Sequence, residues 1–298
     1  MLNIFGKKSA SEGATATPEE IAALLKGFSI EIMPRTAAKI EDFKAILPAG
    51  TRVYIAHIDG TPIEDMVATA KRIVADGFPC MPHFPARGIE SVAQLEEWIG
   101  LYREVGVEEG LMLAGGIADV RGPFPSSMEM METGLFEKNG FTRLHIAGHP
   151  EGNKDIDPDG STKNVDAALK WKQAYSEKTT AKMAIATQFA FDGKAVGVWA
   201  DRLKAEGITI PIHIGIAGPT KLQTLIKFSI ACGVGASLKV LQKRALDLSK
   251  LLVPYEPTEV LAELVEYKKA TPESLIDTVH FFPLGGIAAN AEWAREHG

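Results

Sequence analysis

Chemically versatile residues follow short apolar runs at many points of the sequence. Carboxylates and imidazoles are the side chains most often used to move protons, and glycines let the backbone approach a ligand closely. If the apolar runs are parallel strands of one barrel, the residues at their carboxyl ends meet in one place. We therefore expect one site built from Glu31, His57, His83, Gly115, Gly116, His149, Glu151, Gln188 and His280.

Glu31 is the strongest candidate for a catalytic acid. It lies between Ile30 and Ile32, so strand alternation places it on the opposite face from both neighbours, toward the interior or the mouth of the fold. A buried carboxylate is costly unless it is used or paired. Apolar surroundings would raise its pKa and suit it to general acid catalysis at neutral pH. The alternative is a structural carboxylate paired with Arg35 or with a lysine.

Histidines at strand ends permit a metal site, but their spacing lacks the i, i+4 pattern of a zinc-binding helix, and we predict no metal. His145 and His213 fall inside strands and are expected in the core or at the mouth. The acids at 155, 157 and 159 resemble a calcium loop with poorly spaced later ligands, so we expect a solvated loop there. Cys80 and Cys232 lie in apolar sequence and predict buried thiols, which suits a reducing cytoplasm.

The motifs for nucleotide and serine chemistry are missing from the sequence. There is no P-loop, no G-x-S-x-G elbow and no G-x-G-x-x-G fingerprint after a strand. Glycines at 115, 116 and 122 instead allow close backbone approach to a flat or phosphorylated ligand. Lys170 and Lys172 either meet the charge of such a ligand or form a solvated pair.

Strands and helices alternate along the chain, which predicts a parallel sheet. Eight such units favour a single (β/α)8 barrel over residues 17–298, with an open doubly wound sheet as the rival. The expected strands are 28–32, 52–57, 78–83, 110–115, 143–147, 183–189, 210–215 and 278–282. The expected helices are 18–26, 63–75, 91–105, 125–138, 165–177, 195–206, 219–231, 236–252 and 258–269.

Composition limits the classes of partner. Hydrophobic residues make up 46% of the chain and charged residues 23%, which is typical of a soluble globular protein. The net charge of -6 argues against nucleic acid as a main partner. We expect no signal peptide, no membrane segment and a flexible leader over 1–16, while a homo-oligomer stays open.

Seven motifs occur in the order seen in methylenetetrahydrofolate reductases, which the chain resembles from about Phe28 to its end. They are FSIEIMPR, PHFPAR, LMLAGG, GHPEG, LKWK, ATQFAFD and HIGIAGP. The resemblance implies an FAD-dependent barrel that interconverts 5,10-methylenetetrahydrofolate and 5-methyltetrahydrofolate, with NAD(P)H as the partner in electron transfer. Flavin and nicotinamide would share one face of the barrel, which accounts for the missing dinucleotide fingerprint.

The resemblance also assigns roles to individual residues. Glu31 matches the catalytic acid, Gln188 the folate-contacting glutamine, and Leu222 the place where an aromatic residue often packs on the substrate. The residues matched to the flavin site are His57, His83, Gly115, Gly116, Ile117, His149, Glu151, Asp166 and Lys172.

The sequence departs from the family pattern after the fourth expected strand. Many members have Arg-Gly-Asp where this chain has Gly115-Gly116-Ile117, and Asp119 is the candidate substitute for that acid. Loss of a negative charge near the flavin would favour the anionic reduced flavin, which suggests tuning toward oxidation of methyltetrahydrofolate. Initial rates in both directions would test this, and a strong reductive preference would contradict it. Two alternatives remain, a flavin-free tetrahydrofolate-dependent methyltransferase and a non-catalytic folate-binding barrel.

Overall fold

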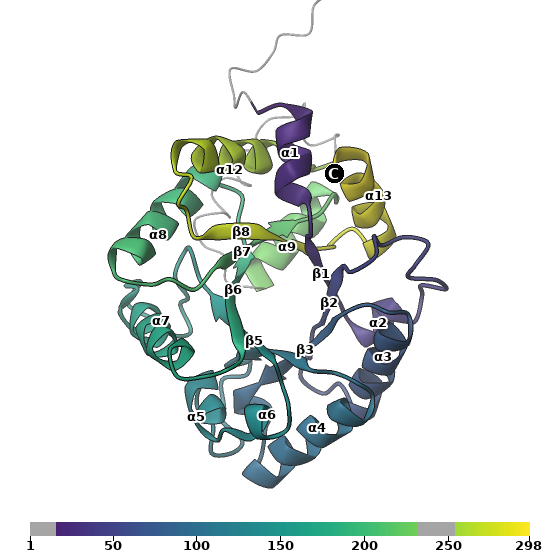
Figure 1. Cartoon of the computed structure of the whole chain (residues 1–298), viewed down its shortest axis with the longest axis vertical. Helices are drawn as coiled ribbons and strands as arrows, with labels where there is room; N and C mark the ends of the chain where they lie inside the picture. Colours follow the sequence, from purple (N-terminus) through teal and green to yellow (C-terminus); the bar gives the residue numbers. More distant parts are fainter. Residues whose placement is uncertain (1–15, 232–253) are drawn as a thin grey trace, which may run out of the picture.

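Eight parallel strands close into a barrel in sequence order, β1 to β8, and helices surround it (Figure 1). The computed structural model describes residues 16–231 and 254–298. The strands are β1 (Ser29–Ile32), β2 (Arg52–Ile55), β3 (Cys80–Pro85), β4 (Glu109–Leu113), β5 (Arg143–Gly148), β6 (Lys182–Phe189), β7 (Ile212–Ala217) and β8 (Ile276–Phe282). The predicted (β/α)8 fold is therefore confirmed.

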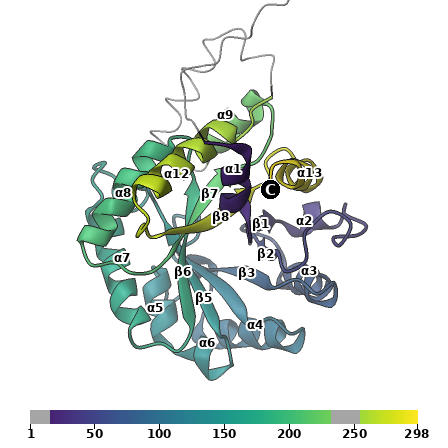
Figure 2. The same cartoon turned by 45° about the horizontal axis from the view of Figure 1, so that its top comes forward.

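Helices cover the outer face of the strands (Figure 2). They are α1 (Pro18–Leu25), α2 (Pro34–Ala37), α3 (Ile63–Ala75), α4 (Val92–Glu104), α5 (Ser127–Glu132), α6 (Leu135–Lys138), α7 (Lys163–Ser176), α8 (Gly193–Ala205), α9 (Leu222–Ala231), α12 (Thr258–Ala270) and α13 (Ile287–His297). The helix expected over 236–252, Cys232 and nearly all of the expected leader lie outside the described residues.

One expected helix is divided. The segment 125–138 forms α5 and α6, and Gly134 between them has φ 66°. That left-handed conformation interrupts a helix and is readily adopted only by glycine. The prediction of one continuous helix was wrong because it did not take into account that Gly134 would interrupt the helix.

The N-terminal helix α1 is stabilised by a hydrogen-bonded cap at its start and by packing against the rest of the protein. Thr17 accepts a hydrogen bond from the Glu20 amide while the Glu20 side chain accepts one from the Thr17 amide, which forms a capping box. Ile21, Leu24 and Leu25 are buried. The helix lies beside α12 and α13, so the two ends of the described chain are neighbours (Figure 1).

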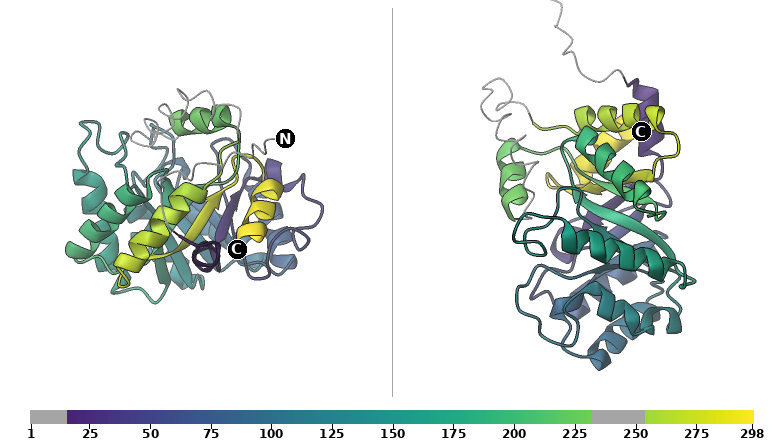
Figure 3. Two further views of the ribbon diagram at one scale, coloured as in Figure 1. Left: turned by 90° about the horizontal axis from the view of Figure 1, so that it is seen from above. Right: turned by 90° about the vertical axis from the view of Figure 1, so that its left-hand side faces the viewer.

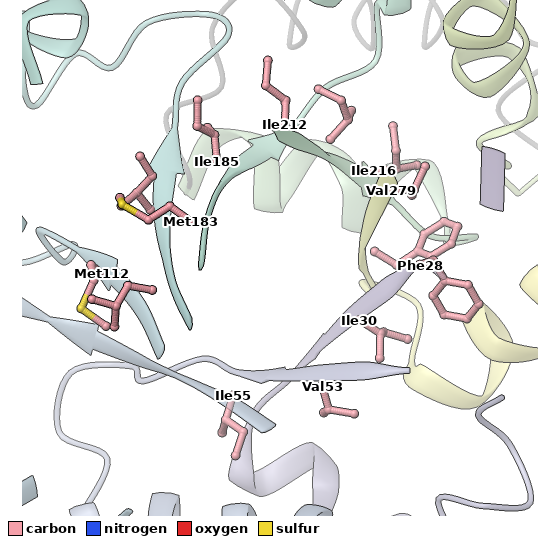
Figure 4. Close-up of a cluster of buried hydrophobic side chains, with 14 of the residues drawn as sticks. Phe28, Ile30, Val53, Ile55, Met112, Met183, Ile185, Ile212, Ile216 and Val279 are labelled. Atoms are coloured by element: carbon pink, nitrogen blue, oxygen red, sulfur yellow. The ribbon is translucent and has the colours of Figure 1, made fainter. Parts of the chain in front are cut away.

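The main apolar core lies between the barrel and its helices. Alternate strand residues such as Ile30, Val53, Ile55 and Ile185 point outward from the strands toward the helices (Figure 4). Their neighbours in sequence point inward, since side chains alternate along a strand. Several of those inward positions carry polar groups.

Helix α9 stands apart from the ring of helices, at one end of the barrel (Figure 3). None of the helices within 16–231 and 254–298 is both long and apolar enough to cross a bilayer.

Candidate active site

Glu31 lies near the carboxyl end of β1 and contacts two histidines. Its Oε2 atom is 3.2 Å from Nε2 of His83 on β3 and 3.8 Å from Nε2 of His280 on β8. The side chain of Glu31 is 19% exposed, whereas that of His280 is 1% exposed. Three strands thus bring a carboxylate and two imidazoles together, as strand alternation predicted for Glu31. Its partners are not Arg35 or a lysine.

The two histidines change the acidity of Glu31. Burial raises its pKa, but the charge of His83 and the nearby imidazole of His280 outweigh burial and lower the pKa to about 2. The expected upward shift was therefore wrong, because the surroundings are not apolar. The carboxyl group of Glu31 is therefore ionised at neutral pH.

The side chain of His57 lines a pocket beside the barrel mouth instead of joining the cluster around Glu31. Its ring packs at 5.1 Å from the ring of Trp98, and its Nε2 atom lies 3.1 Å from the Thr61 carbonyl oxygen. Burial lowers the pKa of His57, partly offset by the Thr61 carbonyl. The pocket, of about 220 Å³, is also lined by Gly115, Gly116, Ile117 and Arg121.

The segment after β4 is shaped by its glycines. Gly115 has φ 95°, and a Cβ atom there would lie 3.1 Å from Pro85. The Ile117 carbonyl accepts a hydrogen bond from Arg87 at 3.3 Å. Asp119 is exposed, so the carboxylate considered as a substitute for the family acid points to solvent in this conformation.

His149 and Lys172 form a second polar region, between β5 and α7. Lys172 is 6% exposed, and burial lowers its pKa to about 8. Burial, followed by the charge of Lys172, lowers the pKa of His149 to about 4. Burial alone accounts for the shift in the pKa of Lys172, with no opposing contribution from a carboxylate. Glu151 is half-buried in the loop that follows.

Asp166 joins two helices. Its oxygens accept hydrogen bonds from both terminal nitrogens of Arg202 on α8, at 2.7 and 3.0 Å, and from the Thr162 hydroxyl at 2.7 Å. Both oxygens are thus engaged inside the protein. Its assignment to the flavin site stays a prediction.

The two residues assigned to the folate lie near β6 and α9. Gln188 is half-buried, and its Oε1 accepts a hydrogen bond from the Phe189 amide. Leu222 is 2% exposed and belongs to an apolar cluster with Phe189, Phe191, Ala217, Leu225 and Tyr255. Contact between Leu222 and a substrate would require this cluster to open.

Part of the acidic loop before α7 caps the amino end of that helix. Asp157 is 2% exposed and accepts hydrogen bonds from the amides of Asn164 and Val165. The expectation of a solvated loop was wrong for this residue, because its carboxylate satisfies the free amides at the helix start. Among the residues placed in the structure, no three His, Cys, Asp or Glu side chains are arranged so that they could hold a metal ion. Cys80 is a buried free thiol, as predicted.

Sequence reasoning missed Ser29 and Tyr54. Ser29 Oγ is 2.9 Å from Nδ1 of His280, and the Tyr54 hydroxyl is 2.5 Å from Nδ1 of His145. The signal was present, since Ser29 alternates with Ile30 and Tyr54 lies between Val53 and Ile55. Both residues therefore face the barrel interior with Glu31.

The fold and the site define a (β/α)8 barrel with a titratable cluster at the carboxyl ends of its strands. No known family model matches the chain. A solved structure similar to it is the carboxyl transferase domain of Rhizobium etli pyruvate carboxylase, with 11% sequence identity, a TM-score of 0.40 and coverage of 87% of this chain and 49% of that chain. This chain spans about half the length of that one.

A second similar structure is a dehydrogenase/reductase from Sinorhizobium meliloti 1021. It is 12% identical, with a TM-score of 0.26 and coverage of 91% of this chain and 98% of that chain. Similarity at this level carries no inference about activity.

Proposed function

We propose that the protein is a flavin-dependent oxidoreductase that interconverts 5,10-methylenetetrahydrofolate and 5-methyltetrahydrofolate with NAD(P)H or NAD(P)+. The observation that carries the proposal is the contact of Glu31 with His83 and His280 at the carboxyl ends of the strands. The seven sequence motifs support it, because they occur along the chain in the order found in methylenetetrahydrofolate reductases.

The donor set fits the anionic part of FAD. Lys172 is a buried cation whose pKa is lowered by burial with no opposing contribution from a carboxylate, and it lies beside a His149 whose low pKa keeps it neutral at pH 7. A buried lysine without a counter-ion is costly, and a phosphate would supply the missing charge. Lys172 and His149 would therefore hold the diphosphate, and Gly115 and Gly116 would allow close approach of the backbone. When bound, FAD would carry hydride between nicotinamide and folate.

The Glu31–His83 pair would handle the proton of the folate reaction. Opening the methylene bridge to an iminium ion requires a proton on the nitrogen that leaves, and that proton would come from the carboxylate–imidazole pair. In the reverse direction, the ionised pair would take the proton back. The side chains of Glu31 and His83 are only 19% and 11% exposed, so bulk water would compete weakly for the transfer.

The visible spectrum of the purified protein with added FAD tests this function. We expect bound flavin that bleaches with NADH or NADPH and recovers when methylenetetrahydrofolate is added. Lys172→Met should weaken FAD binding by about tenfold or more through loss of the charged contact, whereas exposed Lys170→Met is the matched control. Absence of flavin binding by the wild type would overturn the proposal.

A flavin-free folate methyltransferase is the second candidate. It is favoured by the engaged oxygens of Asp166 and by the lack of an acid at 115–117. Binding of tetrahydrofolate without any binding of FAD in the same titrations would support this candidate.

A further inference from the structure

The interior of the barrel contains a column of polar side chains. Ser29, Tyr54, His145, His213 and His280 are each at most 7% exposed. In most barrels of this fold these layers are dominated by branched apolar residues. A barrel interior that contains five buried side chains able to accept and donate a proton is therefore unusual for this fold.

The upper half of the column leads away from Glu31. Nε2 of His280 is 3.8 Å from Glu31, and its Nδ1 is 2.9 Å from the Ser29 hydroxyl. The ring of Tyr54 lies beside this pair, with its centroid 4.3 Å from that of the His280 ring. The Tyr54 hydroxyl is 2.5 Å from Nδ1 of His145. The hydroxyls and imidazole nitrogens of these two hydrogen bonds accept or donate according to hydroxyl rotation or imidazole tautomer.

The lower half reaches solvent at the amino ends of the strands. The rings of His145 and His213 meet edge to face with their centroids 4.9 Å apart. Nε2 of His145 and Nδ1 of His213 have no hydrogen-bond partner. Nε2 of His213 is 3.5 Å from Asp277, whose side chain is 63% exposed near the start of β8.

Charged groups surround this lower half. Arg52 and Arg143 both pair with Glu109, and they face His145 together with His213 and His280. Burial, then His213 and the two arginines, keeps the pKa of His145 well below its usual range. Lys268 faces Asp277 from α12. His145 is thus neutral at pH 7, with one nitrogen to accept a proton and one to donate.

We propose that this column is a proton relay that connects Glu31 with solvent at the opposite end of the barrel. Its members, in order from solvent, are Asp277, His213, His145, Tyr54, Ser29 and His280. None of them is expected to touch the substrate; they act through Glu31. The relay rests on the proposed function only for its use, because a flavin and a folate at the barrel mouth would cover Glu31 and shut off the direct path to water.

The proton balance of the relay is simple. One proton enters from water at Asp277, and one proton arrives at the ionised Glu31. Each imidazole or carboxylate in between accepts a proton on one of its atoms and releases a different proton from its other atom. Each hydroxyl accepts one proton and releases another from the same oxygen. Every relay member begins and ends in its original charge state. Rotation of the hydroxyls and imidazoles then restores the starting tautomers.

Exchange of the His145 ring N–H with water, measured by NMR on histidine-labelled full-length protein, tests the relay without any activity. In Asp277→Asn we expect this exchange to slow by about tenfold or more, although Asp277 has no contact with His145. Because Asp277 is exposed, this variant should fold. Tyr102→Phe is the control, since its buried hydroxyl has no hydrogen-bond partner and lies outside the column.

A second measurement tests the use of the relay. Tyr54→Phe keeps the ring but cuts the chain, so the folate half-reaction should slow by about tenfold and show a larger solvent isotope effect. Reduction of the flavin by NADH should be unchanged, as should both half-reactions in Tyr102→Phe.

The outcomes separate the relay from the proposed function. Unchanged His145 exchange in Asp277→Asn overturns the relay. Slowed exchange in a protein that binds no flavin supports the relay as a proton path and contradicts the proposed function. Slowed exchange with an unaltered folate half-reaction in Tyr54→Phe overturns the claim that the relay supplies Glu31.

Discussion

At the scale of single residues, Glu31 owes its properties to the two histidines beside it. Burial alone would raise the pKa of its carboxyl group, yet the pKa is lowered to about 2 because His83 and His280 together exceed the effect of burial. The acid of the site is therefore the carboxylate–imidazole pair. Oε2 of Glu31 and Nε2 of His83 are 3.2 Å apart.

This depressed pKa makes a prediction about stability. In the unfolded chain Glu31 titrates near its ordinary value of 4.5, whereas in the folded protein it titrates near 2. The ionised group thus stabilises the fold above its unfolded pKa, and this contribution is lost as the pH falls through the folded pKa. We expect the difference in unfolding free energy between wild type and Glu31→Gln to be constant above about pH 5 and to shrink below it.

Urea unfolding followed by circular dichroism across this pH range measures that difference. Glu104→Gln, which removes an exposed carboxylate at the end of α4, is the matched charge control. A difference that grows as the pH falls would mean that folding raises the pKa of Glu31 instead of lowering it.

At the scale of elements, the close approach of β5 to β6 depends on Gly148, just before His149. A Cβ at Gly148 would lie 2.3 Å from a methyl carbon of Ile185 and 3.4 Å from Trp199 on α8. The strand and helix that hold this part of the site therefore pack against the bare backbone. Both neighbours are themselves buried in the core and have little room to move.

Gly148→Ala should therefore destabilise the protein by about 2 kcal/mol, the typical cost of overpacking a core. Gly100→Ala is the matched control. Gly100 lies within α4 with no other atom within 4 Å of the added Cβ, so the change should stabilise the helix by about 0.5–1 kcal/mol. Chemical denaturation of both variants checks the pair, and equal effects would show that the tight packing around Gly148 is absent.

At the scale of the whole molecule, periodicity was enough to predict the barrel, because strands and helices bury different repeating patterns. Boundaries moved by a few residues, and Gly134 divided one expected helix. The position of Glu31 followed from alternation, but its pKa did not, since it depends on His83 and His280 from strands far along the chain. The polar column was missed for the same reason, because Tyr54 and His145 are brought together only when the barrel closes.

The central claim, that Glu31 delivers the proton of a flavin-dependent folate reaction, is tested most directly by single-turnover kinetics of Glu31→Gln loaded with FAD. We predict that reduction of the flavin by NADH is unchanged, while oxidation of the reduced flavin by methylenetetrahydrofolate slows by about 10²-fold or more through loss of general acid catalysis. Equal rates of both half-reactions in wild type and Glu31→Gln would contradict the account.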